Sequence, residues 1–164
     1  MPNANYLKEL FDLSGKVAVV IGGTGELCGT IGVGLARAGA EVVLVGRIRE
    51  KAQRWIDEIE STGGKAWFVP ADVTSRQSLE DLMDTVLDKT ERVDILVNGA
   101  GYNAPTPFFD ITDEEFLRII NTNLSAVFHA CQVFGEHFID SGLPASIINV
   151  GSIAALKPLS RVFS

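Results

Sequence analysis

The sequence has few cysteines and histidines, and each shortage excludes a class of protein. Cys28 and Cys131 are the only two cysteines among 164 residues, too few for a disulfide framework and not a CxxC pair. We therefore expect both to be reduced packing residues. His129 and His137 stand eight residues apart with no third ligand at a recognisable spacing, so we expect no metal site.

Basic residues and long apolar runs are also scarce. Lysine and arginine number 14 against 21 aspartates and glutamates, which gives a net charge of -7. An acidic surface attracts neither nucleic acid nor an anionic membrane, so we expect neither partner. No run approaches the roughly 20 apolar residues that span a bilayer, and the N-terminus lacks the apolar core of a signal peptide. A cytoplasmic location is the resulting expectation.

Short β-branched runs alternate with longer segments of helical periodicity. Near-continuous apolar strands of this kind are typical of a parallel sheet that is buried on both faces. We predict an α/β fold, a doubly wound, Rossmann-like parallel sheet in three α/β/α layers, as a single domain over residues 1–164. The expected strands are 17–21, 41–45, 66–69, 93–97 and 146–150, and the expected helices are 29–38, 50–61, 75–90 and 113–140.

The stretch VIGGTGELCGT, residues 20–30, places four glycines where the first predicted strand turns into the first helix. At such a turn, backbone amides and the helix dipole converge on an anion. The stretch matches neither GxGxxG nor the loop that requires Gly-Lys-Ser/Thr. Its position favours a phosphate cradle, and a tight turn without a ligand remains the alternative.

The second predicted strand ends in Val-Gly-Arg, about twenty residues after the glycine turn, where a dinucleotide site meets the adenosine ribose. Gly46 removes the carboxylate that would accept from both ribose hydroxyls. Arg47 offers a fork suited to a 2′-phosphate, with Arg49 near enough to help. We expect NADP(H) to be preferred over NAD, and the alternative is a solvated arginine at a helix start.

Five segments in order resemble the short-chain dehydrogenase/reductase family, from about residue 11 to residue 164. GGTGELCG stands at the family's TGxxxGxG loop, ADV at its Asp-Val and NGAG at its NNAG. NTNL and INVGS resemble the segments that carry its helix asparagine and its catalytic serine. The resemblance implies catalytic roles for Ser152 and Asn123. The implied cofactor-binding residues are Gly22, Gly23, Thr24, Gly25, Leu27, Arg47, Asp72, Val73, Asn98, Gly99, Ala100 and Gly101.

Several of these residues also suit the chemistry by their position. Asp72 follows a strand end, where a carboxylate can meet an adenine amine, or it caps the helix that starts near Ser75. Asn98 and the small residues after it let the chain pass close to an adenosine ring, with an ordinary turn as the alternative. Ser152 lies beyond the fifth strand, where a hydroxyl can orient a substrate carbonyl or cap a helix.

Asn123 interrupts an apolar helix face that it shares with Phe116, Ile120 and Val127. We therefore expect a buried amide that needs hydrogen-bond partners. The resemblance implies that this asparagine supports a water in the proton relay, and a structural hydrogen bond is the alternative.

Hydride transfer to a carbonyl needs a proton donor, which the family supplies with a tyrosine followed four residues later by a lysine. Tyr6 and Tyr102 are followed at that spacing by Leu10 and Thr106, and Ser164 is the last residue. We expect a chain truncated before this pair, with the last strands of the fold absent. The alternative is a catalytically inactive nucleotide-binding or interaction module.

The glycine loop also departs from the family pattern. Glu26 and Cys28 stand where the family has glycines, and Gly99 replaces an asparagine. A carboxylate at residue 26 would repel a pyrophosphate unless its side chain points outward.

The predicted function is hydride transfer between NADP(H), with NAD as the second choice, and a small-molecule carbonyl or secondary alcohol. Three segments resemble a subgroup of the family that includes fructuronate reductases, also called mannonate oxidoreductases: FDLSGKVA, NGAGYNAP and KPLSRV. This resemblance implies a sugar acid as the substrate. Asn103 and Arg161 would then bind its hydroxyls or carboxylate, and the alternative for both is an ordinary residue of a surface loop. The family also implies a homo-oligomer, a dimer or tetramer, formed through helices such as 75–90 and 113–140.

Overall fold

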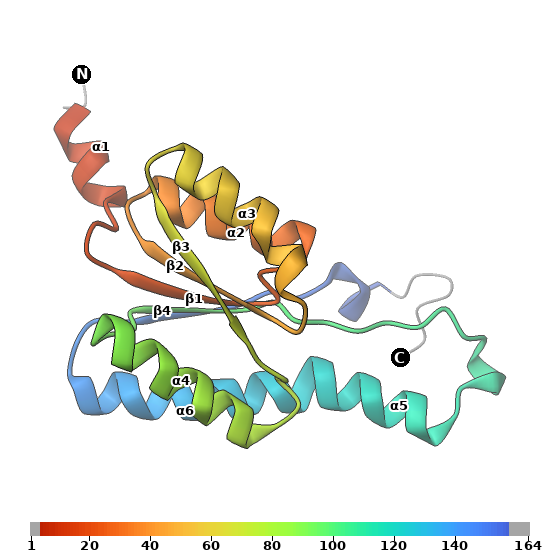
Figure 1. The fold of residues 1–164 in the computed structure, drawn as a ribbon. Helices are drawn as coiled ribbons and strands as arrows, with labels where there is room; N and C mark the ends of the chain where they lie inside the picture. The colour runs from red at the N-terminus through yellow and green to blue at the C-terminus, as the bar shows by residue number, and fades with distance from the viewer. Residues whose placement is uncertain (1–3, 158–164) are drawn as a thin grey trace.

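Five parallel strands form one sheet in the computed structural model, which describes residues 4–157. The spatial order is β3-β2-β1-β4-β5, so the first strand is central and the later strands lie on both sides of it (Figure 1). The strands are β1 Val17–Ile21, β2 Glu41–Gly46, β3 Lys65–Pro70, β4 Ile95–Asn98 and β5 Ser146–Asn149. The helices are α1 Ala4–Phe11, α2 Glu26–Arg37, α3 Arg49–Ser61, α4 Arg76–Thr90, α5 Asp113–Ile120 and α6 Ala126–Ser141.

Two helical layers cover the sheet, with α2 and α3 on one face and α4 and α6 on the other (Figure 1). Alternate residues of a strand point to opposite faces. In β1, Ala18 and Val20 therefore pack toward the α2–α3 layer, while Val19 and Ile21 pack toward the α4–α6 layer. Burial on both sides explains the near-continuous apolar runs, and the predicted three-layer α/β fold is confirmed.

The central strand β1 pairs with β2 on one side and β4 on the other, in parallel register. Val19 stands opposite both Val43 and Leu96. The chain runs from β1 to α2 in one layer and from β4, through α5, to α6 in the other layer, so the loops after β1 and β4 separate at the carboxyl edge. Open α/β sheets bind ligands in the crevice that forms at this switch point.

Two expectations about helices need correction. The predicted single helix over 113–140 is interrupted by a π-helical turn, Asn121–Ser125, which separates α5 from α6. Helix α1 was not expected, and α2 begins at Glu26 rather than at residue 29 because Gly25 adopts the extended N-cap conformation. The first turn of α2 is therefore made by the residues of the glycine-rich stretch itself.

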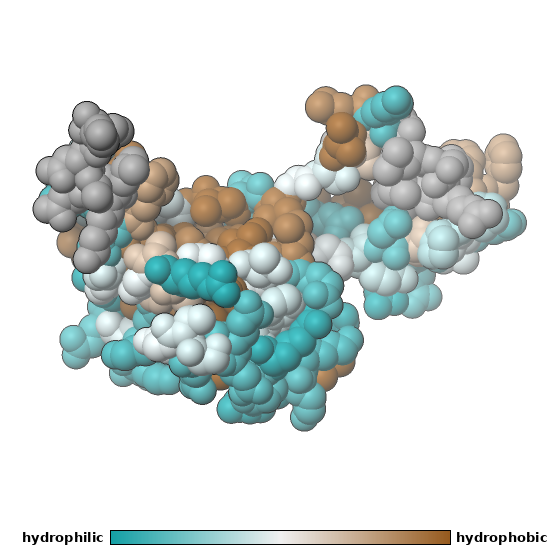
Figure 2. Space-filling view, turned by 90° about the horizontal axis from the view of Figure 1, so that it is seen from above, coloured by the Kyte–Doolittle hydropathy of each residue, from teal (hydrophilic) through white to brown (hydrophobic). Residues whose placement is uncertain are grey.

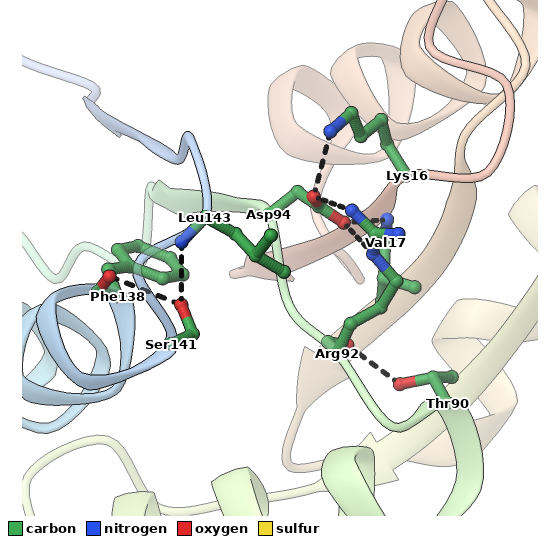
Figure 3. Close-up of polar contacts among 8 residues, drawn as sticks. All are labelled: Lys16, Val17, Thr90, Arg92, Asp94, Phe138, Ser141 and Leu143. Carbon is green, nitrogen blue, oxygen red and sulfur yellow. Dashed lines mark hydrogen bonds and ion pairs between the residues drawn. The ribbon is translucent and has the colours of Figure 1, made fainter.

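Asp94 joins two chain segments, residues 16–17 and 92–94, at the amino edge of the sheet (Figure 3). Its carboxylate, 2% exposed, accepts from the Val17 amide (2.9 Å), from Lys16 Nζ (3.1 Å) and from Arg92 Nε (2.8 Å). Burial raises the pKa of Asp94, but hydrogen bonds from Arg92, the Val17 amide and Lys16 outweigh it and hold the pKa below its ordinary value. The network fixes the start of β1 against the segment that leads into β4.

On the side of α2 and α3, much of the visible surface is hydrophilic, and hydrophobic residues gather in the upper part of this view (Figure 2). β5 is one of the two edge strands of the sheet among the described residues, and its Ile147 and Ile148 are 38% and 43% exposed. Within residues 4–157, the helices are all too short or too polar to cross a bilayer.

Candidate functional site

A cavity of about 280 Å³ lies at the carboxyl edge of the sheet, at the switch point between β1, β2 and β4. Four loops enclose it, one after each of the strands β1 to β4. Its lining residues are Gly22, Thr24, Gly25, Gly46, Arg47, Ala71, Asp72, Val73, Thr74, Gly99, Ala100, Gly101, Tyr102, Arg118 and Thr122.

Gly22 brings the loop after β1 against the loop after β4. Its φ of +81° lies in the left-handed region, which favours glycine. A Cβ at this position would lie 2.8 Å from the amide nitrogen of Ala100 and from the carbonyl of Gly99. The two loops therefore touch through backbone, and any larger residue would separate them.

The amino end of α2 points into the same region. Gly25 is its N-cap and has no side-chain capping bond, so the cap adds no group that blocks the approach of a ligand. The backbone amides of residues 26–28 have no acceptor inside the helix. Amides of this kind, together with the helix dipole, form a site for a phosphate or another anion.

The end of β2 supplies a cation beside this amide cluster. Arg47 is exposed and lines the cavity. Gly46 packs so closely on Thr24 that an added Cβ would lie 2.7 Å from its methyl carbon. Arg49, expected to assist Arg47, instead lies over the ring of Phe68 at 5.9 Å and is not among the cavity residues.

Asp72 lies across the cavity in the loop after β3. Its carboxylate accepts from the Thr74 amide (3.0 Å) and from the Thr74 hydroxyl (2.7 Å). These two bonds, with a smaller contribution from Arg47, hold the pKa of Asp72 below its usual range. The expected alternative role as helix cap is wrong, because the hydroxyl of Ser75 caps α4 by accepting from the Ser78 amide.

The loop after β4 divides into a buried and a cavity-facing part. Asn98 is 3% exposed, and its Nδ2 donates to Asn149 Oδ1 (2.9 Å), which ties β4 to β5. Gly99, Ala100 and Gly101 line the cavity after it. The backbone of this loop thus faces the cavity, while the Asn98 side chain forms a hydrogen bond between two strands of the sheet.

Asn123 holds the next part of the same loop. Its Oδ1 accepts from the Tyr102 amide and its Nδ2 donates to the Tyr102 carbonyl, both at 2.8 Å. The expectation of a buried amide on an apolar face is wrong, because Phe116 and Asn123 are exposed. The π-helical turn changes the helix phase at this point, so residues before and after it do not share one face.

Ser152 lies just beyond β5, where its Oγ accepts from the Ala154 amide (3.1 Å) and caps the short 3₁₀ turn Ile153–Ala155.

Some of the predicted site residues lie away from the cavity. Gly23 is buried beneath Leu44, and Leu27 points into solvent at 61% exposure. Arg161 lies outside the described residues. The predicted site residues that do not line the cavity are Gly23, Leu27, Asn98, Asn123 and Ser152.

Sequence reasoning did not assign Thr74, Tyr102, Arg118 or Thr122 to the cavity. The Arg118 guanidinium lies over the Tyr102 ring, 4.0 Å from its centroid. One signal was present, because residues 118 and 122 are four apart on a predicted helix and so share a face. Nothing local indicated that this face meets the loop after β4.

The sequence profile described as short chain dehydrogenase matches residues 16–164. The uncharacterized oxidoreductase UxuB of Bacillus subtilis (strain 168) is 39% identical over 92% of this chain and 59% of its own length. A metagenomic short-chain oxidoreductase solved in complex with NADP is 31% identical, with a TM-score of 0.85 over 92% of this chain and 68% of that one. NAD+-bound xylitol dehydrogenase is 27% identical, with a TM-score of 0.85 over 91% and 57%. The chain therefore spans about three fifths of the length of UxuB.

Proposed function

The chain belongs to the short-chain dehydrogenase family, and from this premise we propose that it binds NADP(H) in an oxidoreductase that acts on a carbonyl or secondary alcohol. The cavity at the carboxyl edge of the sheet carries the proposal. It combines the free amides of α2, two glycine loops in backbone contact and an exposed arginine. When bound, the nicotinamide supplies or accepts the hydride.

The residues present fit a dinucleotide. Gly22 and Gly25 leave room for a pyrophosphate against the amides of α2, since neither has a side chain to fill the cradle. Asp72 and Val73 line the part of the cavity after β3, where we propose that they contact the adenine. Gly99, Ala100 and Gly101 provide the flat backbone surface for the adenosine.

We assign the preference for NADP(H) to Arg47. No carboxylate stands at the end of β2 to accept from two ribose hydroxyls, and a guanidinium fork matches a 2′-phosphate. The oxidoreductase solved with NADP and the xylitol dehydrogenase solved with NAD+ have this same fold, so the fold itself selects neither cofactor.

The chemical roles of Ser152 and Asn123 belong to the proposal as well. The Ser152 hydroxyl would orient the substrate oxygen, and Asn123 would support the proton relay through the backbone that it holds. The tyrosine and lysine that the family uses are not among these 164 residues, and we assign no residue of this chain to that role.

We propose a polyhydroxylated substrate, a sugar acid, which Asn103 would help to bind. Xylitol dehydrogenase, by its name, acts on a polyol, and its fold matches this chain with a TM-score of 0.85. A homo-oligomer in the cytoplasm completes the proposal.

Titration of the purified protein with NADPH and NADH tests the cofactor assignment. Arg47→Leu removes a charge-assisted contact, so NADPH affinity should fall about 10- to 100-fold while NADH affinity changes little. Arg49→Leu is the matched control and should leave both affinities within about twofold, because its guanidinium lies over Phe68. Equal losses for the two cofactors would refute the role of Arg47, and binding of neither by the unaltered protein would refute the proposed function.

A further inference from the structure

Glu26 is an unfavourable residue for phosphate binding at the amino end of α2. It is the first residue of the helix, next to Gly25 of the cavity. A carboxylate here is attracted by the same amides and the same dipole that would bind a phosphate. It would therefore compete with an anionic ligand unless something holds it elsewhere.

Arg54 of α3 holds it elsewhere. Its Nη2 forms an ion pair with Glu26 Oε1, across the outer surface of the α2–α3 layer. The side chain of Glu26 is 79% exposed, and Glu26 does not line the cavity. The carboxylate thus points outward, away from the amides of its own helix.

The position of Arg54 is itself fixed by packing. Its guanidinium lies over the ring of Trp55, 4.3 Å from the centroid. That ring is buried against Gly29 of α2, where an added Cβ would lie only 2.1 Å from the indole. Gly29, Trp55 and Arg54 therefore form one continuous stack that ends at Glu26.

From this geometry we propose that Arg54 is a positioning residue for cofactor binding. By pairing with Glu26, it keeps a negative charge out of the phosphate cradle and leaves the α2 amides open. The inference rests on the proposed function, since it concerns the phosphates of a dinucleotide. An exposed ion pair contributes little to stability, so its main effect should appear in ligand affinity.

The test is a titration of four variants of the purified protein with NADPH. Arg54→Gln should weaken binding about three- to tenfold in about 20 mM salt, and the loss should shrink in about 500 mM salt because the repulsion is screened. Glu26→Gln should bind at least as tightly as the unaltered protein. The double variant R54Q/E26Q should recover the affinity to within about twofold.

Arg37→Gln is the matched control, because Arg37 joins the same two helices through Glu58 at 3.5 Å but lies at the far end of α2. It should change thermal stability as little as Arg54→Gln does and leave NADPH affinity unchanged. Unchanged affinity in Arg54→Gln would overturn the inference, as would a loss that Glu26→Gln fails to rescue. If the unaltered protein binds no NADPH, the proposed function fails and the inference with it.

Discussion

Two departures from the family pattern compensate for each other at the level of single residues. Cys28 stands where the family has glycine, and Gly99 stands where it has asparagine. A Cβ at residue 99 would lie 2.1 Å from Cys28 Sγ. Because Gly99 has no side chain, the loop after β4 leaves space for the Cys28 thiol. The thiol donates to the Gly99 carbonyl at 3.6 Å. Burial raises the pKa of this thiol, so it is a packing group rather than a nucleophile.

Gly99→Ala should destabilise the protein by about 1 to 2 kcal/mol, because the thiol must leave its site. The double variant C28A/G99A should recover most of that loss. Gly34→Ala, in open space on the exposed side of α2, should instead be neutral or stabilise by about 0.5 to 1 kcal/mol. Urea denaturation measures these three variants and Cys28→Ala, and free-energy changes of the two single variants that add up in the double variant would refute the pairing.

Asp94 makes stability depend on pH. Its folded pKa lies below its unfolded value of about 3.9, so its contribution is fully present above that value and is lost as pH falls through the folded pKa. Asp94→Asn should lower the free energy of unfolding by about 2 to 4 kcal/mol at pH 7, because Lys16 and Arg92 lose their partner.

Urea denaturation at a series of pH values checks this prediction. The difference between Asp94→Asn and the unaltered protein should shrink below about pH 4. Asp84→Asn on the exposed face of α4 is the control and should stay within about 0.5 kcal/mol throughout. A difference that is independent of pH would contradict the electrostatic origin.

Among the elements, the π-helical turn Asn121–Ser125 connects the helical layer to the cavity. It presents Asn123 to the Tyr102 backbone, while α6 beyond it packs on α4 and the sheet. A π-bulge of this kind is frequent at functional sites. Because the turn changes the helix phase, Asn123 contacts the cavity loop while α6, directly after it, packs in the core.

Asn123→Ala should release the loop at Tyr102 by removing both 2.8 Å hydrogen bonds. We expect chymotrypsin to cleave after Tyr102 several times faster than in the unaltered protein, with about 1 to 2 kcal/mol lost in stability. Asn121→Ala, in the same turn, serves as control, because the Asn121 side chain accepts from Ser125 and forms no hydrogen bond to this loop among the described residues. Equal cleavage rates for both variants would show that Asn123 does not hold the loop.

At the scale of the whole molecule, three large apolar side chains of α6 and of the π-helical turn before it are exposed. Leu124, Phe128 and Ile139 are 63%, 57% and 82% exposed. Phe128 and Ile139 lie eleven residues apart on one face of α6, and Leu124 lies in the π-helical turn directly before that helix. An exposed apolar stripe of this kind marks an interaction surface, which supports the proposed homo-oligomer.

The double variant L124E/F128E should shift the protein toward the monomer by placing two charges in that surface. Sedimentation velocity over a range of concentrations measures the change. Ile48→Glu, an equivalent change at an apolar position 45% exposed beside α3, should not alter the association. The same distribution of species in both variants would refute α6 as the contact surface.

Part of the cavity lining can be predicted from the sequence, because parallel strands place their carboxyl ends at one edge of the sheet. The strand-edge rule and the family resemblance together predict the glycines after β1, Arg47 after β2, Asp72 after β3 and Gly99 after β4 at this edge. Arg118 and Thr122 are not predicted, since they reach the cavity from a helix whose orientation no local pattern specifies. The outward direction of Glu26 likewise depends on Arg54, 28 residues later in the chain.

The sequence by itself determined the fold class, the positions of the five strands along the chain and the edge of the sheet at which the cavity lies. These follow from hydrophobic periodicity and glycine positions, which act over a few residues. Only the tertiary structure decided the phase of the helix around Asn123, the match between Cys28 and Gly99 and the outward direction of Glu26. Each of these depends on close contact between segments far apart in the chain, where steric fit and charge pairing set the outcome.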